Sequence, residues 1–181
     1  MESQPYQDSA YRNDSYWDTN DTYRQIQPEQ AVAYIAGGPL APGIRGTVTF
    51  TRAMGGTEVS VEVHGLPPYQ PATNGKAPVG PHGFHIHEIG SCVTGDPAEP
   101  FTSAGGHWNP THQPHGNHAG DFPVLFSNNG YSRMTFFTNQ FSVDQIIGKA
   151  VIIHEHPYDY RTQPDGAGGH RLACGVIQEN G

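Results

Sequence analysis

In the stretch TEVSVEV, residues 57–63, three valines alternate with polar side chains. The valines fall on one face of an extended chain, and Ser60 and Glu62 fall on the other, because successive strand residues point to opposite faces. One apolar face and one polar face are typical of a half-buried antiparallel strand. The stretch therefore predicts an all-β domain, either a sandwich or a barrel.

Seven further runs are rich in β-branched or aromatic residues, and each is closed by Gly, Pro or Asn. In chain order they are AVAYIA, IRGTVTF, GFHIHEI, FPVLF, SRMTFF, KAVIIHE and RLACGVI. Together with TEVSVEV they predict about eight strands. Two long irregular segments, 90–121 and 156–169, remain between them, and loops of this length inside a compact domain usually carry function or disorder.

The chain of 181 residues suits one domain preceded by a tail. Residues 1–29 hold six acidic residues and four tyrosines with almost no aliphatic side chain, so we expect a disordered acidic tail there and a folded domain over residues 30–181. With 9 basic against 17 acidic residues, the net charge of -8 disfavours nucleic acids and anionic membranes as partners.

All eleven histidines lie from position 64 onward, and most gather in two places. His85 and His87, in GFHIHE, are two residues apart in a predicted strand, so both rings project from one face and can converge on one ion. An isolated pair of this kind is more often a hydrogen-bonded polar patch beside a core. Here a second cluster follows, which favours a metal site.

The second cluster lies in GGHWNPTHQPHGNHAGD, residues 105–121. It offers three imidazoles and one carboxylate, from His107, His115, His118 and Asp121, in a loop where glycine and proline permit tight turns. This donor set suits tetrahedral zinc. A flexible histidine-rich loop that binds metal loosely is the other interpretation of the same spacing.

A third element, AVIIHEHPYDY, ends a β-rich run at His154. His156 has the same facing parity, so parity alone leaves open which of the two binds a metal.

Nucleophilic chemistry has no support in the sequence. There is no G-x-S-x-G turn, no phosphate-binding loop, no H-E-x-x-H and no C-x-x-C. Metal chemistry is therefore the remaining candidate.

Five motifs occur in the order GFHIHE, AGGHWNP, HAGD, IIGKAVIIHE and RLACGVI, and in them the chain resembles the bacterial copper-zinc superoxide dismutases over residues 30 to about 178. Several independent motifs in order are more specific than any one of them. The resemblance implies an eight-stranded Greek-key β-barrel with a long metal-binding loop and a shorter electrostatic loop. It also implies an enzyme that uses copper and zinc to convert superoxide to oxygen and hydrogen peroxide.

The same motifs imply the site residues. Copper would have four histidine ligands, which are His85, His87, His107 and His154. Zinc would be bound by His107, His115, His118 and Asp121, so that His107 is the bridging imidazolate. On reduction, His107 would leave copper, take up a proton and deliver it to the second superoxide.

Two more positions receive roles from the resemblance. Arg171, in RLAC, would guide the anion to copper. Because an acidic protein needs a local positive patch to attract an anionic substrate, we also expect Arg161 to add to that patch. His82, in PHGFHIH, would be structural and outside the ligand set. His107 and Arg171 thus form the implied catalytic pair.

The resemblance also implies a disulfide between Cys92 and Cys174, which the cysteine count alone leaves open. Closing these 82 positions would contribute about 4.5 kcal/mol in the chain-entropy model and tie the metal loop to the last strand. The alternative is a pair of buried thiols.

Two departures from the family pattern concern the metal site. His115 and His118 lie closer together in sequence than in the usual zinc loop, and His112 is a competitor for the place of His115. The family places an aspartate four residues after the third copper ligand, where it links the outer nitrogens of copper and zinc ligands. Tyr158 stands at that position here, with Asp159 next to it.

The sequence leaves the compartment open. The start of the chain has neither a basic n-region nor an apolar h-region, and no stretch approaches the roughly 18 apolar residues of a membrane span. These features favour the cytosol or unconventional export, whereas a disulfide favours oxidising surroundings.

The predicted function is superoxide dismutation, with the superoxide anion as substrate and a homodimer as a possible assembly. The alternative is a catalytically silent protein of the same fold that sequesters copper or zinc or lies in a surface layer. Loss of a copper ligand would favour that alternative, and none is lost. A copper chaperone is disfavoured because the chain lacks an N-terminal C-x-x-C.

Overall fold

The computed structural model describes residues 28–180, so nearly all of the tail predicted over residues 1–29 lies outside the described residues. Across this range, seven strands form one sheet. In chain order they are β1 (Gln30–Gly37), β2 (Arg45–Ala53), β3 (Gly56–His64), β4 (Phe84–His87), β5 (Ser132–Thr138), β6 (Ala150–His154) and β7 (Arg171–Glu179). Two short helical pieces, η1 (Thr102–Ala104) and α2 (Val143–Ile146), complete the regular structure, which confirms the all-β prediction.

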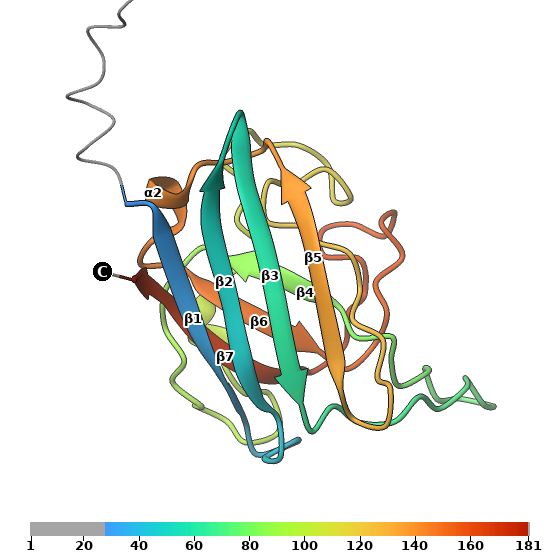
Figure 1. Ribbon diagram of the computed structural model, residues 1–181. Coiled ribbons are helices and arrows are strands. Elements are labelled where there is room, and N and C mark those ends of the chain that lie inside the picture. Colours follow the sequence, from blue (N-terminus) through green and yellow to red (C-terminus); the bar gives the residue numbers. More distant parts are fainter. Residues whose placement is uncertain (1–27, 181) are drawn as a thin grey trace, which may run out of the picture.

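Every neighbouring pair of strands in the sheet is antiparallel, in the order β4-β6-β7-β1-β2-β3-β5. The sheet curls, so that β4, β6 and β7 cross behind β1, β2, β3 and β5 (Figure 1). The chain passes from β3, the next-to-last strand at one end of the sheet, to β4 at the other end, and returns to β5, which lies beside β3. Such long connections between distant strands are typical of a Greek-key barrel.

The core lies between the two layers of the curled sheet. β3 buries Val59, Val61 and Val63 at 0%, 1% and 0% exposure, as its alternation predicts. These valines belong to one cluster with Phe84 and Ile86 of β4 and with apolar residues of β6 and β7. The core therefore holds the rear strands, including the histidine-bearing β4, against the front layer.

The eighth predicted run, FPVLF, does not form a strand. In residues 122–126 only Leu125 pairs, through an isolated bridge to His82. Pro123 has no backbone N–H, so it cannot donate to a sheet ladder. The segment still contributes Phe122 and Leu125 to the core.

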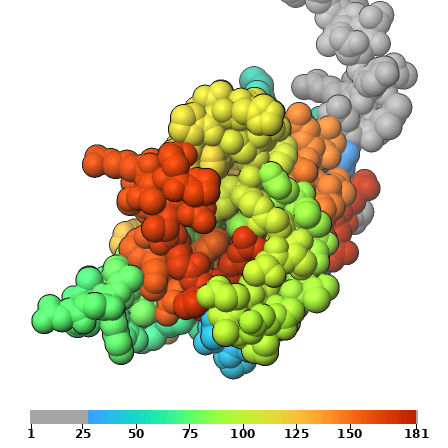
Figure 2. Space-filling view, turned by 180° about the vertical axis from the view of Figure 1, so that it is seen from behind, coloured from blue at the N-terminus to red at the C-terminus, as the bar shows by residue number. Residues whose placement is uncertain are grey.

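Two long segments cover the outer face of the rear strands. One joins β4 to β5, and the other joins β6 to β7. From behind, the orange-red segment near residues 155–170 lies beside the yellow segment near residues 110–120 (Figure 2). The backbone N–H of His115 donates to Gln163 Oε1 at 2.8 Å, which links the two segments directly.

Among residues 28–180, no helix is both long and apolar enough to span a membrane.

Cys92 and Cys174 form a disulfide, as predicted, with 5.6 Å between their Cα atoms. Cys174 lies in β7 and is buried in a small cluster with Phe101, Ala104, Ala150 and Ile152. The disulfide and this cluster together anchor the long β4–β5 segment to the rear strands.

We predict that replacing both cysteines by alanine lowers the free energy of unfolding by about 4.5 kcal/mol, because the unfolded chain regains the freedom of an 82-residue loop. Denaturant titration of the metal-free double variant beside the wild-type chain measures this difference. A loss below about 1 kcal/mol would contradict the prediction, and adding reductant to the double variant, as the control, should change nothing.

Candidate metal centre

β4 presents two different faces. Phe84 and Ile86 point into the core, and His85 and His87 point the other way, as strand alternation requires. All four side chains are buried, because the two long segments cover the histidine face. The strand thus delivers two buried imidazoles to one site.

β4 is the last strand of the sheet, and two parts of the β4–β5 segment form hydrogen bonds with its free edge. Trp108 N–H donates to the carbonyl of Ile86 at 2.8 Å, and Ile86 N–H donates to the carbonyl of Gly120 at 2.9 Å. A Cβ on Gly120 would lie 2.6 Å from that same Ile86 oxygen, so only glycine allows this approach. These bonds bring His107 and Asp121, which adjoin Trp108 and Gly120 in the sequence, alongside the strand.

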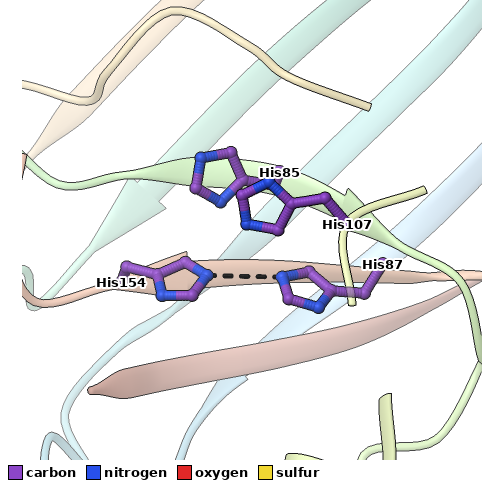
Figure 3. A group of neighbouring side chains, drawn as sticks. All are labelled: His85, His87, His107 and His154. Atoms are coloured by element: carbon purple, nitrogen blue, oxygen red, sulfur yellow. Dashed lines mark hydrogen bonds between the residues drawn. The ribbon is translucent and has the colours of Figure 1, made fainter. Parts of the chain in front are cut away.

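The structure brings four imidazoles together, and we call them the four-histidine group: His85, His87, His107 and His154. Their ligand nitrogens all lie within 4.8 Å of one another. Figure 3 shows the rings converging from β4, from the end of β6 and from the loop that carries His107. His154 lies at a register shift at the end of β6, whereas His156 lies outside the group.

Hydrogen bonds fix the orientation of two of these rings. Nδ1 of His87 lies 3.0 Å from the carbonyl oxygen of Gly105, and Nδ1 of His154 lies 3.3 Å from that of Gly169. A carbonyl only accepts, so each Nδ1 carries the proton and each Nε2 keeps its lone pair. The two Nε2 atoms face each other at 3.3 Å, joined by the dashed line in Figure 3.

Two facing lone pairs need a cation or a proton between them. Burial and the neighbouring imidazoles lower the pKa of His85 and of His87 well below the usual value. The same two causes, burial first, lower the pKa of His154 to about 3. Protons are thus disfavoured, and a metal cation is the charge that fits this donor set.

A second group, which we call the zinc-type group, consists of His107, His115, His118 and Asp121, again with ligand atoms within 4.8 Å of one another. Nδ1 of His107, His115 and His118 lies 3.0, 3.2 and 3.4 Å from the carboxylate of Asp121. Burial would raise the pKa of Asp121, but the hydrogen bonds from His107 and the Gly116 N–H keep it below its usual value. The group therefore offers three nitrogens and one anionic oxygen, which suits tetrahedral zinc.

The short spacing of the zinc-type group fits a tight turn. The backbone N–H groups of Gly116 and His118 donate to Asp121 Oδ2 at 2.8 and 3.1 Å, so the carboxylate closes the turn that carries the histidines. His112 is exposed and lies outside the group, whereas His115 is 4% exposed and inside it. Of the two histidines, His115 is therefore the one that the fold brings to the other three potential ligands.

His107 belongs to both groups. Its Nδ1 lies 3.0 Å from Asp121 Oδ1, while its Nε2 is buried without a hydrogen-bond partner in the described structure. Both ring nitrogens of His85 are also buried without such a partner there. Orphaned buried nitrogens are costly unless a ligand satisfies them, so the residues present fit two metal ions.

Arg171 lies at the start of β7 and lines a cavity of about 310 Å³ that His87, His107 and His154 also line. Its guanidinium donates to the carbonyls of Phe101 at 2.6 Å and Gly105 at 2.7 Å. Burial lowers the pKa of Arg171 from its usual value, and the nearby Asp165 and Glu99 work against that shift. Arginine is charged at neutral pH in proteins, so the cavity offers a cation to an anion.

Sequence reasoning missed the carboxylates of Glu99 and Asp165, which line the same cavity. They lie in separate loops, 66 positions apart in number, and no local pattern marks them. Arg161, which the sequence predicted to add positive charge, is exposed and is not among the cavity-lining residues.

His82 lies outside both groups. Its two ring nitrogens lie 2.9 Å from the carbonyl oxygen of His154 and 3.1 Å from that of Pro67. The ring therefore braces the backbone of His154, in line with the structural role that the sequence predicted.

Comparison with known proteins shows which family this chain is similar to. The family model for copper/zinc superoxide dismutase matches residues 44–177. The superoxide dismutase [Cu-Zn] of Deinococcus radiodurans is 38% identical over 152 residues, covering 75% of this chain and 78% of that protein. The enzyme of the same name from Escherichia coli K12 is 38% identical over 146 residues, covering 74% and 78%.

Solved structures agree with the sequence comparisons. The Cu/Zn superoxide dismutase from Brucella abortus matches with a TM-score of 0.66 and 31% identity, over 83% of this chain and all of that one. A double mutant of a SOD-like protein from Bacillus subtilis matches with a TM-score of 0.62 and 30% identity, over 81% of this chain and 96% of that one.

The metal-free protein should lose stability as the pH falls below about 6.5. His85, His87 and His154 have lower pKa values folded than unfolded, so below 6.5 the unfolded chain binds more protons and the free energy of unfolding falls. Each such histidine contributes about 1.4 kcal/mol per pH unit in this window. Thermal melting of chelator-treated protein between about pH 7.5 and 4.5, where Asp121 stays ionised, measures the slope.

Two substitutions test the origin of that slope. His154→Gln should make it shallower, and His64→Gln, which changes a half-exposed histidine outside both groups, should leave it as it is. An unchanged slope in His154→Gln would contradict the explanation.

Proposed function

The chain belongs to the copper/zinc superoxide dismutase family, and from that premise we propose which of its residues carry the activity. The protein is a superoxide dismutase that uses copper and zinc, and it converts two superoxide anions and two protons into oxygen and hydrogen peroxide. We assign copper to the four-histidine group and zinc to the zinc-type group. The observation that carries this assignment is the membership of His107 in both.

The donor chemistry supports this distribution of the metals. Four imidazoles suit copper, because nitrogen ligands tolerate both of its oxidation states. The zinc-type group adds the carboxylate of Asp121, and three nitrogens with one oxygen make a usual tetrahedral zinc set. His107 uses different nitrogens toward the two groups, as its Nδ1 contact with Asp121 and its unpartnered Nε2 indicate.

Copper, when bound, supplies the one-electron redox chemistry, and zinc supplies a fixed charge beside it. The protein residues then bind the substrate and move protons. His107 holds its ring through Nδ1 beside Asp121, so Nε2 can take up a proton and pass it to the peroxide that forms. The second proton comes from solvent, which reaches the site through the cavity that Arg171 lines.

Arg171 attracts and orients the anionic substrate. The protein carries a net charge of -8, so a substrate anion approaches only where a local cation outweighs the overall field. Two carbonyl bonds hold the guanidinium at the cavity wall beside His87, His107 and His154. The charge is therefore in place before the anion arrives.

The silent metal-binding alternative requires a missing or displaced copper ligand. In this chain the ligand nitrogens of the four histidines lie within 4.8 Å of one another and the arginine lines the adjoining cavity, which supports a complete site. That two copies of the chain pair stays a prediction from the family resemblance.

We predict that single substitutions separate the two metals. His154→Ala should lose most of the copper and all dismutation while keeping zinc, and His115→Ala should lose zinc while keeping copper, because each removes a ligand of one group only. Elemental analysis of purified protein, together with superoxide decay after pulse radiolysis, measures both outcomes.

The chain offers a matched control for each variant. His156→Ala and His112→Ala remove the nearest sequence competitors, which lie outside both groups, and should keep both metals. Copper loss in His156→Ala, or zinc loss in His112→Ala, would contradict the assignment.

Arg171→Ala should slow dismutation by about tenfold at low ionic strength and weaken its dependence on salt, because the local cation is gone. The dismutation rate of Arg171→Lys should lie between those of Arg171→Ala and the wild-type protein, since lysine keeps the charge but not the hydrogen bonds to both carbonyls. Arg161→Ala, at an exposed arginine outside the cavity, is the control. A wild-type rate and salt dependence in Arg171→Ala, measured at equal copper content, would exclude the steering role.

A further inference from the structure

Tyr158 lies between the two metal groups. Its side chain is 3% exposed, although it belongs to the loop between β6 and β7. Its ring centroid is 4.3 Å from that of His85, in the four-histidine group, and 5.2 Å from that of His115, in the zinc-type group. One side chain therefore touches one ligand from each group.

Two glycines, Gly166 and Gly83, approach this tyrosine closely. A Cβ on Gly166, which has φ +69°, would lie 2.8 Å from Tyr158 Cβ and 2.4 Å from His115 Nε2. A Cβ on Gly83 would lie 3.1 Å from Tyr158 Cδ1 and 3.2 Å from His85 Cε1. Side chains on either side would push the tyrosine or the histidines out of place.

The orientation of the His85 ring depends on packing more than the orientations of the His87 and His154 rings do. His87 and His154 are oriented by carbonyl oxygens that accept from Nδ1, whereas both ring nitrogens of His85 lack a hydrogen-bond partner in the described structure. A ligand whose outer nitrogen is not held by a hydrogen bond needs another contact to fix its ring.

The carboxylate next to Tyr158 does not supply that contact. Asp159 Oδ1 accepts from the backbone N–H groups of Arg161 at 2.9 Å and Thr162 at 2.7 Å, and its Oδ2 accepts from the Thr162 hydroxyl at 2.6 Å. Asp159 is thus exposed and closes its own turn. Of the two side chains, the one against the metal groups is the aromatic ring.

We propose that Tyr158 is a positioning residue, which by ring packing holds His85 and His115 in their metal-binding orientations and so couples the copper and zinc sites. The proposal rests on the ligand assignment made above. The hydroxyl of Tyr158 is buried without a hydrogen-bond partner in the described structure, so it is the ring that contacts His85 and His115. The ring, and not the hydroxyl, is the part that acts.

The test compares Tyr158→Phe with Tyr158→Leu in the copper-loaded full chain. Zinc affinity is measured by competition with a chromophoric chelator, and the copper environment by the Cu(II) EPR spectrum. Tyr158→Leu should bind zinc about tenfold more weakly or worse and change the EPR hyperfine splitting, because His115 and His85 lose their shared contact. Tyr158→Phe keeps the ring and should match the wild-type protein in both measurements.

A core variant controls for loss of stability alone. Val59→Ala removes a fully buried side chain of β3 outside both metal groups, so it should lower the melting temperature without altering zinc affinity or the EPR spectrum. If Tyr158→Leu does not fold, Tyr158→Met, which fills irregular space, takes its place.

Two results would overturn the proposal. One is Tyr158→Leu with wild-type zinc affinity and EPR spectrum, and the other is Tyr158→Phe with losses as large as those of Tyr158→Leu, which would make the hydroxyl the acting group. Failure of the ligand assignment is distinguishable, because His115→Ala would then bind zinc as tightly as the wild-type protein.

Discussion

The free edge of β4 is the constraint on which the metal centre depends. A strand at the end of a sheet has unpaired N–H and C=O groups, and burying them without partners is costly. Here Ile86 is bonded on that edge by Trp108 and Gly120. The two bonds that satisfy the strand are also those that place His107 and Asp121 beside His85 and His87, so one requirement of the backbone assembles ligands from three segments.

The centre is built at an electrostatic cost that metal ions offset. Buried imidazoles disfavour protonation, and Nε2 of His87 and Nε2 of His154 face each other at 3.3 Å with their lone pairs directed inward. Such an arrangement destabilises the metal-free protein and favours the binding of a cation. A metal ion that binds to these preorganised nitrogens therefore stabilises the folded chain.

The substrate cavity takes its shape from the attachment of the long β4–β5 segment to β7. The disulfide fixes one point of that segment, and Arg171 fixes two more through the carbonyls of Phe101 and Gly105. Gly105 also accepts from His87 Nδ1, so a single carbonyl meets both the arginine and a ligand of the four-histidine group. On the proposed assignment, anion attraction and the orientation of a copper ligand are linked through this one backbone group.

The sequence by itself determined the features that follow a local period or a specific motif. Strand alternation placed the valines of β3 in the core and turned His85 and His87 to one face, and the motifs identified the family and the cysteine pair. Sequence could not settle the loops, because irregular backbone has no period that assigns a side chain to a face. FPVLF has the composition of a strand, yet Pro123 and the approach of His82 leave it only one bridge.

The remaining choices were made by contacts between distant segments. His115 rather than His112 faces Asp121 because the Gly116 and His118 N–H groups close a turn on that carboxylate. Tyr158 rather than Asp159 faces the two histidine groups because Asp159 is held by the N–H groups of its own turn, which leaves the ring to pack beside Gly166. Side-chain orientation in a loop is fixed by what the folded chain brings next to it, and only the tertiary structure contains that information.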